Sequence, residues 1–185
     1  MDSLLRKSGS ELARLIREGE CRAIEVVERH IERIEQVDPR LNAVVRKRFD
    51  AARQEAVEAD TLVDLAPADD LPPLHGVPCT IKESCALRGM PNSSGLVSRA
   101  GIVAAEDAPP VARLRAAGAI PLGVTNTSEI TAWPGADNRV YGRTGNAYDP
   151  DYQSGGSSGG EGAIIGAGGS PFGLGTDIGG SIRIP

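Results

Sequence analysis

Two serine-containing segments near the C-terminus lie in unusually glycine-rich sequence. The first is Gly-Gly-Ser-Ser-Gly-Gly at 155–160, and the second is Thr-Asp-Ile-Gly-Gly-Ser at 176–181. Glycine lets the backbone turn sharply, so successive amide groups can point toward one place and stabilise a developing oxyanion. A serine hydroxyl held in such backbone can attack a carbonyl carbon if a base removes its proton. The pattern therefore indicates nucleophilic catalysis by serine.

The sequence favours Lys82 as the base for such a serine. The chain has only two histidines, and a Ser-His-Asp triad would need one of them. His30 falls in a predicted helix as a surface or core histidine, and His75 falls in a proline-rich loop. Lys82 directly follows the apolar residues 77–81, where desolvation would favour a neutral amine able to accept a proton. On these residues alone, a glycine-rich turn region with only a structural role remains the alternative.

Motifs for nucleotide and metal chemistry do not fit the sequence. No GxxxxGK[ST] motif occurs, so the glycines do not form a phosphate-binding loop of the usual type. Gly166 and Gly168 begin a GxGxxG pattern, but Pro171 occupies the place of its last glycine. The zinc motif HExxH is absent as well. These observations leave serine and lysine as the residues that carry the chemistry.

Length, composition and charge are typical of a globular protein with one domain. The chain has 185 residues, of which 40% are hydrophobic but only 3% aromatic, so aliphatic residues and alanine must fill its core. The net charge is -5 without a dense basic stripe, so we expect no binding to nucleic acid. No stretch approaches the ~20 apolar residues that span a bilayer, and the N-terminus lacks the apolar core of a signal peptide.

The three cysteines do not suggest a disulfide framework. Cys21, Cys79 and Cys85 are odd in number and show neither a CxxC motif nor the spacing of zinc ligands. We expect buried, inert thiols in a reducing, cytoplasmic setting. Neither the cysteines nor the histidines predict a metal site.

Residues 1–65 are predicted to form a helical scaffold. A short helix capped by Ser10 comes first. A longer helix spans 22–37, where apolar residues recur at helical spacing, and Pro39 contributes to its end. A strand over 41–47 follows, because it contains β-branched valines, and then a polar helix over 50–59.

Residues 66–124 predict an alternation of strands and a helix. A proline-rich loop over 66–78 leads into a short buried strand at 77–81. A helix over 109–117 starts at a proline, and an apolar strand at 120–124 comes next. Strand, helix and strand in this order indicate an α/β layer structure with helices covering a mostly buried sheet.

Residues 155–185 contain 12 of the 23 glycines. A flexible linker would lack apolar residues, whereas seven large ones are interleaved here. They are Ile164, Ile165, Phe172, Leu174, Ile178, Ile182 and Ile184. We therefore expect this segment to be ordered backbone that turns sharply or approaches a ligand.

The segment from Leu74 to the C-terminus resembles the amidase signature family. The motif at 155–160 and the run Gly-Thr-Asp-Ile-Gly-Gly-Ser-Ile-Arg-Ile-Pro at 175–185 carry the resemblance. The 75 positions from Lys82 to Ser157 and the 24 from Ser157 to Ser181 fit the spacing of the family's lysine and two serines. The resemblance implies an α/β fold with a mixed, twisted sheet covered by helices on both faces. It also implies one amidase domain over 1–185, with a catalytic core over 74–185.

The resemblance implies a catalytic role for three residues. Ser181 would be the nucleophile, Ser157 the proton relay that follows a cis Gly156–Ser157 peptide bond, and Lys82 the base. No metal and no organic cofactor would be required. The oxyanion would be stabilised by four backbone amides, those of Ile178, Gly179, Gly180 and Ser181.

Less specific similarities to the family imply contacts around these three residues. Thr131, Ser157 and Ser158 would contact the substrate, and Ser158 would form hydrogen bonds near the catalytic residues. Asp177 and Arg183 flank the nucleophile and are interpreted mainly as supports of its loop. Two asparagines are expected to hold loops in place, namely Asn126 and Asn146.

The implied reaction is hydrolysis of a carboxylic amide to the acid and ammonia or an amine through an acyl-serine intermediate. The sequence Gly160-Glu161-Gly162, which follows the paired serines, resembles that of fatty-acid amide hydrolases and general amidases. The alternatives are the A-type subunit of a transfer-RNA-dependent amidotransferase and a non-catalytic fragment. The expected partner is a small-molecule amide, and a homo-oligomer is compatible with the sequence. Family members continue far beyond the nucleophile, whereas this chain stops at Pro185, so we expect an incomplete fold with weak or no activity of its own.

Overall fold

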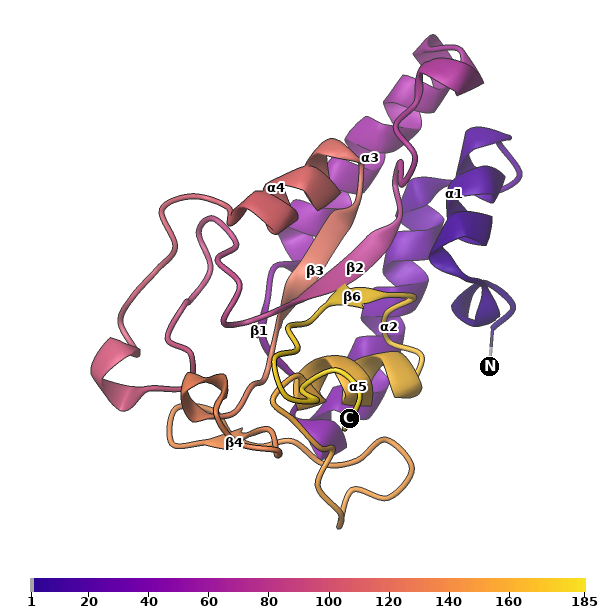
Figure 1. The fold of residues 1–185 in the computed structure, drawn as a ribbon. Helices are drawn as coiled ribbons and strands as arrows, with labels where there is room; N and C mark the ends of the chain where they lie inside the picture. The colour runs from indigo at the N-terminus through magenta and orange to yellow at the C-terminus, as the bar shows by residue number, and fades with distance from the viewer. Residues whose placement is uncertain (1) are drawn as a thin grey trace.

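A four-stranded mixed sheet lies at the centre of the computed structural model, which describes residues 2–185 (Figure 1). Its strands, in spatial order, are β1 (Val44–Lys47), β3 (Ile120–Thr125), β2 (Pro78–Lys82) and β6 (Gly173–Leu174). β1 runs antiparallel to β3, whereas β2 is parallel to both β3 and β6. The predicted strands at 77–81 and 120–124 are therefore neighbours at the centre of the sheet.

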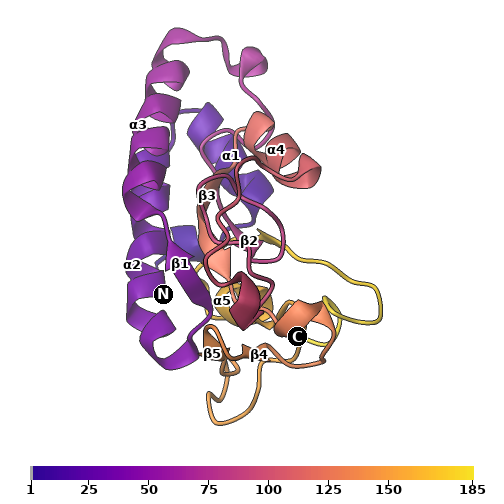
Figure 2. The same cartoon turned by 90° about the vertical axis from the view of Figure 1, so that its left-hand side faces the viewer.

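Helices cover both faces of this sheet. They are α1 (Gly9–Arg17), α2 (Ala23–Leu41), α3 (Phe49–Leu65), α4 (Pro109–Ala116) and α5 (Gly159–Gly166). Figure 2 shows α2 and α3 on one side of β2 and β3 and α4 on the other. A small hairpin of β4 (Asp137–Asn138) and β5 (Gly142–Arg143) lies outside the main sheet. No helix in the described range is both long and apolar enough to cross a membrane.

Two apolar clusters hold the layers together. The larger one joins α1, α2, α3 and α5 to the sheet, with buried residues such as Ile31 and Leu122. The smaller one packs Val111 of α4 against Cys79 and Ile81 of β2. Since the larger cluster includes residues from both ends of the chain, the predicted helical scaffold packs directly on the predicted catalytic core. The division at residues 65 and 74 stays a prediction.

The ends of the N-terminal helices differ from the prediction. Ser8, not Ser10, caps α1, because its side chain accepts the Glu11 amide while the Glu11 carboxylate accepts the Ser8 amide. α2 does not end at Pro39 but continues to Leu41, and Asn42 ends it with a left-handed φ of 51°. Pro39 lies inside the last turn of α2. Asp38 accepts the amides of Ala43 and Val44 just after the helix and so joins its end to β1.

α5 is a helix that the sequence did not predict, although its segment was expected to be ordered. Four of its eight residues are glycine, which costs about 1 kcal/mol each relative to alanine in a helix. Burial offsets this cost, since Ala163 and Ile164 belong to the larger apolar cluster. The first turn of α5 directly follows the paired serines, so packing of this helix fixes their position.

The three cysteines are unpaired thiols. Cys79 is buried as expected, whereas Cys21 and Cys85 are only half-buried. Burial raises the pKa of all three thiols, that of Cys21 to about 11, so the neutral form dominates. Neutral thiols are poor nucleophiles, in agreement with the inert role that the sequence predicts.

Candidate active site

Lys82 is the last residue of β2, and its side chain is completely buried. Side chains alternate along a strand, so Lys82 shares one face with Thr80, while Cys79 and Ile81 pack toward α4. The Lys82 Nζ donates hydrogen bonds to Ser157 Oγ at 2.6 Å and to Thr176 Oγ1 at 2.7 Å. The Lys82 amine thus contacts two residues that follow it by 75 and 94 positions in the sequence.

The surroundings of Lys82 favour its neutral form. Burial lowers the pKa of this amine from 10.5 to about 8, because the charged form loses its hydration. The negative charges of Glu161 and Asp177 act in the opposite direction, but burial dominates. The lysine is therefore a group that can gain and lose a proton near neutral pH.

Ser157 is fully buried and lies between the Lys82 amine and the start of α5. The Gly156–Ser157 peptide bond is cis, as the resemblance implies. Glycine is needed at 156, because a Cβ there would come within 2.6 Å of the Gly135 carbonyl carbon. The glycine-rich sequence thus allows two backbone segments to touch directly behind the serine.

Ser158 ties the segment of Ser157 to the segment of Ser181. Its amide donates to the Ser181 carbonyl at 3.0 Å. Its hydroxyl donates to the Thr176 carbonyl at 3.1 Å and accepts the Thr176 amide at 3.2 Å. The expected hydrogen bonds of Ser158 near the predicted catalytic residues are confirmed, whereas a contact with substrate stays a prediction.

Asp177 organises the turn that carries Ser181. Its carboxylate accepts the Gly180 amide at 2.7 Å, the Ile182 amide at 3.0 Å and the Arg183 Nη2 at 2.8 Å. The Arg183 guanidinium and these amides hold the pKa of Asp177 well below its usual range. The predicted supporting role of Asp177 and Arg183 is confirmed by these contacts.

The same carboxylate changes the set of amides available to an oxyanion. The Gly180 amide is directed at Asp177, so in this structure it does not face the site. Within residues 2–185, the amides of Ile178, Gly179 and Ser181 form no hydrogen bond. These three stay the predicted oxyanion donors.

Ser181 is half-buried and faces a hollow of about 390 Å³. Among the described residues, no hydrogen bond joins its hydroxyl to Ser157, so the proton path between the two serines stays a prediction. The walls include Thr131 and Gly156 and are otherwise mainly apolar. The apolar side chains are those of Ile130, Ala132, Trp133, Pro134, Ile178 and Ile184. The hollow offers an apolar surface beside the predicted nucleophile.

Thr131 is brought to this hollow by an unusual backbone. Ile130 and Thr131 have φ values of 46° and 58°, which β-branched residues rarely adopt. The Ile130 amide donates to the Ser94 carbonyl at 2.8 Å, and buried Glu83 accepts the Ser94 amide at 2.8 Å. Tyr141 also donates to Glu83, at 2.9 Å. The residue next to Lys82 thus supports the wall of the hollow, a role that sequence reasoning missed.

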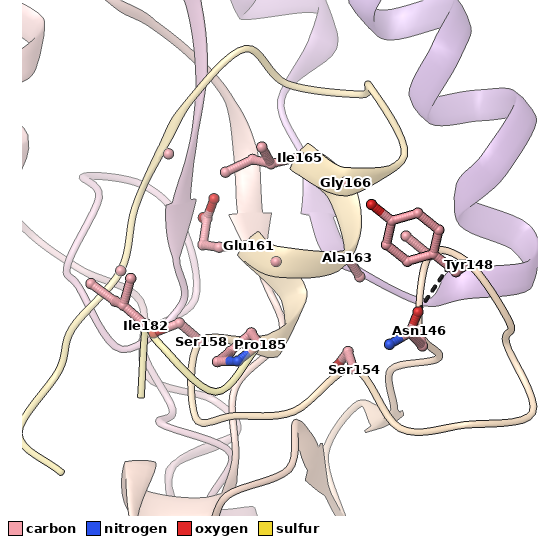
Figure 3. Close-up of a pocket in the computed structure, with 14 residues that line it drawn as sticks. Asn146, Tyr148, Ser154, Ser158, Glu161, Ala163, Ile165, Gly166, Ile182 and Pro185 are labelled. Carbon is pink, nitrogen blue, oxygen red and sulfur yellow. Dashed lines mark hydrogen bonds between the residues drawn. The ribbon is translucent and has the colours of Figure 1, made fainter. Parts of the chain in front are cut away.

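The two asparagines hold loops, as predicted. The Asn126 side-chain Nδ2 donates to the Gly142 carbonyl at 2.9 Å, and its Oδ1 accepts from Asn138 Nδ2 at 2.8 Å. Asn146 accepts the Tyr148 amide at 2.9 Å within its own loop (Figure 3). These bonds fix the segments that lead into the paired serines.

The histidines lie apart from the hydrogen bonds around Lys82. His30 Nδ1 bonds the Val26 carbonyl at 2.8 Å inside α2, and burial lowers the pKa of this imidazole. His75 Nε2 bonds the Ala59 carbonyl at 2.9 Å beside α3. Each ring is therefore a satisfied core group, and neither is placed to act as base for Ser181.

Sequence reasoning also missed Thr176 and the placement of Glu161. Thr176 is the second acceptor of the Lys82 amine, and its position directly before Asp177 was the only available signal. Glu161 is buried behind the lysine and contacts the hydroxyls of Thr80 and Thr125. The distance in sequence between these partners explains why no local pattern revealed them.

A family model described as Amidase matches residues 25–185. Fatty-acid amide hydrolase 2-A of Danio rerio is 53% identical over 187 residues, which cover 98% of this chain and 35% of the relative. A glutamyl-tRNA(Gln) amidotransferase subunit of Acidothermus cellulolyticus is 38% identical over 185 residues, which cover 100% of this chain and 36% of the relative. The chain therefore spans about a third of the length of the curated relatives it matches.

A solved structure of a fatty acid amide hydrolase resembles this chain with a TM-score of 0.93 and 31% sequence identity. The match covers 98% of this chain and 32% of that structure. The predicted α/β fold, with its mixed sheet covered by helices on both faces, is confirmed by this similarity and by the observed strand order.

Proposed function

The chain belongs to the amidase family, and we propose from this premise that it contributes the nucleophile, relay and base of an amide hydrolase. Ser181 is the proposed nucleophile, Ser157 the relay and Lys82 the base. The observation that carries this proposal is the 2.6 Å hydrogen bond between the buried Lys82 Nζ and Ser157 Oγ. A lysine whose pKa burial lowers to about 8 supports its role as a proton acceptor.

The proposed reaction proceeds in two stages. Neutral Lys82 takes the proton of Ser157 while Ser157 takes that of Ser181, and the Ser181 Oγ attacks the amide carbon. The tetrahedral intermediate then collapses, the C–N bond breaks, and the proton passes back through Ser157 to the leaving nitrogen. Water attacks the resulting acyl-serine with the same groups as base, which releases the acid and restores the Ser181 hydroxyl.

The proposed oxyanion donors are the amides of Ile178, Gly179 and Ser181. They belong to a turn that Asp177 and Arg183 brace, so the donors need little reorganisation when negative charge develops. Losing one such donor typically costs about 3 kcal/mol of transition-state stabilisation. Gly180 supports the turn through Asp177 instead of donating to the oxyanion.

An amide hydrolase is favoured over an amidotransferase subunit. The fatty-acid amide hydrolase relative is 53% identical to the chain, against 38% for the amidotransferase relative. The net charge of -5 offers no support for binding transfer RNA. A non-catalytic fragment remains the alternative from another class. A cytoplasmic location and a homo-oligomer stay predictions.

The apolar hollow predicts a preference for apolar acyl groups. Hexanoyl 4-nitroanilide should be cleaved at least about tenfold more efficiently than acetyl 4-nitroanilide, because each buried methylene contributes about 0.8 kcal/mol. The measurement is kcat/KM from released 4-nitroaniline, with Ser181→Ala as the blank. Equal efficiency for the two amides would argue against this substrate class. Release no faster than in the blank, from folded protein, would support the non-catalytic alternative.

The lysine base predicts a rise of reactivity with pH. The rate of Ser181 modification by an alkyl fluorophosphonate should increase about tenfold per unit below pH 8 and level off above it. The sign follows from the lowered pKa of about 8, since Lys82 is protonated and inactive below this value and neutral above it. Rates measured by intact mass from roughly pH 6 to roughly pH 10 test this. A flat profile would exclude Lys82 as the base.

A further inference from the structure

Glu161 is a buried carboxyl group that the proposed reaction does not use. It belongs to the first turn of α5, four residues after Ser157, and is only 5% exposed. Its Oε2 accepts from Thr80 Oγ1 at 2.6 Å, and its Oε1 accepts from Thr125 Oγ1 at 2.7 Å. Burial raises the pKa of this carboxyl to about 7 against the effect of both hydrogen bonds. No ion pair forms with it among residues 2–185.

Both hydroxyl partners of Glu161 are neighbours of Lys82. Thr80 precedes Lys82 by two residues on β2 and therefore lies on the same face of the strand. Thr125 is the residue of β3 that pairs with Lys82 in the parallel ladder. Figure 3 shows the Glu161 side chain between α5 and the strands. Glu161 thus links the helix that begins beside Ser157 to the two strand positions beside Lys82.

Helix capping does not explain this arrangement. Ser158-Gly-Gly-Glu161 has the S-x-x-E pattern of a capping box, in which serine and glutamate bond each other's amides. α1 forms such a box with Ser8 and Glu11. In α5, Ser158 makes no capping bond, its hydroxyl bonds Thr176, and Glu161 turns to the strands. The Glu161 carboxyl group is therefore directed at Thr80 and Thr125, which are neighbours of Lys82 in the sheet.

The neighbouring strand leaves room for this carboxyl group. Gly173 of β6 passes so close that a Cβ at this position would overlap Glu161 Oε2 and come within 2.8 Å of Thr80 Oγ1. Glu161 and Ser158 also border a pocket of about 430 Å³ (Figure 3). The Glu161 carboxyl group fits here because Gly173 has no side chain and because Glu161 borders the pocket.

We propose that Glu161 is a positioning residue for the Lys82–Ser157 pair, and that its protonation state sets the charge which Lys82 experiences. The proposal rests on the proposed role of Lys82 as base. The carboxyl group holds the first turn of α5 against β2 and β3, and so fixes the distance between the amine and Ser157. A misplacement of about 1 Å in such a pair can cost ~10²-fold in rate.

The hydrogen bonds accommodate both protonation states of Glu161. When the carboxyl is ionised, both threonine hydroxyls donate to it. When it is protonated, its proton can be donated to Thr125 Oγ1, because that hydroxyl can then donate to the Ile81 carbonyl at 3.4 Å. A change of charge therefore requires no rearrangement of the backbone.

Lys82 is the cation that responds to this charge. Glu161 and Lys82 interact through their charges, and the Asp177 carboxylate acts on Lys82 in the same direction as Glu161 does. Cys79 and Cys85 also lie near Glu161, but burial keeps both thiols neutral. An ionised Glu161 stabilises the ammonium form of Lys82, whereas a neutral side chain does not. Glu161→Gln should therefore lower the pKa of Lys82.

The test compares Glu161→Gln and Glu161→Leu with the unaltered chain, and Glu58→Gln, at an exposed position of α3, is the control. The readout is the rate of Ser181 modification by an alkyl fluorophosphonate as a function of pH. Glutamine should keep the plateau rate within about threefold and move the midpoint down by about one unit or less. Leucine should lower the rate about 10²-fold at every pH, because the link to the strands is lost. If Glu161→Leu does not fold, Thr80→Val is measured in its place, because it removes one hydrogen bond of Glu161 with little change in volume.

A second measurement separates this inference from the proposed function. The ¹³Cε chemical shift of Lys82, assigned by its loss in Lys82→Ala, reports the pKa of the amine even if Ser181 never reacts. A lower midpoint in Glu161→Gln supports the proposal, whereas an unchanged midpoint overturns the charge effect. Plateau rates that stay within threefold in both Glu161→Leu and Thr80→Val would overturn the positioning role. Absence of any modification of the unaltered chain would count against the proposed function alone.

Discussion

Replacing Lys82 with alanine is expected to slow the modification of Ser181 by an alkyl fluorophosphonate about 10³-fold at neutral pH. General-base groups contribute roughly 10² to 10⁴-fold, and both histidines are engaged elsewhere by backbone carbonyls. The change also leaves the hydroxyls of Ser157 and Thr176 without their common donor. The measurement is the second-order rate constant of adduct formation, followed by intact mass.

The control for this variant addresses folding, because Lys82 fills a fully buried position. Lys82→Met keeps most of the length of the side chain without the amine, and circular dichroism with thermal unfolding shows whether each variant is folded. Lys47→Ala removes a partly exposed lysine from β1 and should leave the rate unchanged. Near-normal rates at neutral pH in folded Lys82→Ala or Lys82→Met would show that the lysine is not the base.

Local patterns in the sequence predicted the part of the fold that carries the base. The apolar residues before Lys82 form β2, and the apolar run at 120–124 forms β3 beside it. Their burial needs no knowledge of distant contacts, because β-branched and apolar runs of this length suit a buried strand. The start of the helix at Pro109 could also be predicted from local sequence, since proline is favoured in the first turn of a helix.

The elements that were missed depend on contacts between distant residues. α5 is rich in glycine, so helix propensity opposes it, and its packing in the larger apolar cluster decides its structure. Glu161 bonds Thr80 across 81 positions, and no spacing rule connects a helix residue with that strand. The same holds for Thr176 and Lys82, which are 94 positions apart. The motif showed the types and spacing of the residues proposed to be catalytic, but it did not show the side chains that hold them in place.

One of the four predicted oxyanion donors forms a hydrogen bond within its own turn, although both partners of this bond belong to the motif. The motif suggested four consecutive amides, including that of Gly180. In the structure the Gly180 amide donates to the Asp177 carboxylate. This carboxylate lies inside the turn, because it also accepts from the Ile182 amide and from Arg183. A sequence pattern can show that a turn contains several amides, but not which of them form hydrogen bonds within the turn.

Replacing Ser181 with alanine is expected to abolish covalent modification by the fluorophosphonate. The reagent loses fluoride as the Ser181 Oγ forms a bond to phosphorus, and alanine offers no oxygen for this bond. Ser157 and Ser158 are not expected to substitute, since both are buried and their hydroxyls are bonded to Lys82 and Thr176. Ser98→Ala, at an exposed position, is the matched control.

Intact mass after treatment with the fluorophosphonate tests the central proposal most directly, with the modified residue located by peptide fragmentation. We predict one adduct per chain in the unaltered protein and in Ser98→Ala, located at Ser181, and none in Ser181→Ala. An adduct that persists in Ser181→Ala, or that maps to another serine, would contradict the assignment of the nucleophile. Folded, unaltered protein that acquires no adduct at all would contradict the proposal that these residues assemble a reactive serine in this chain.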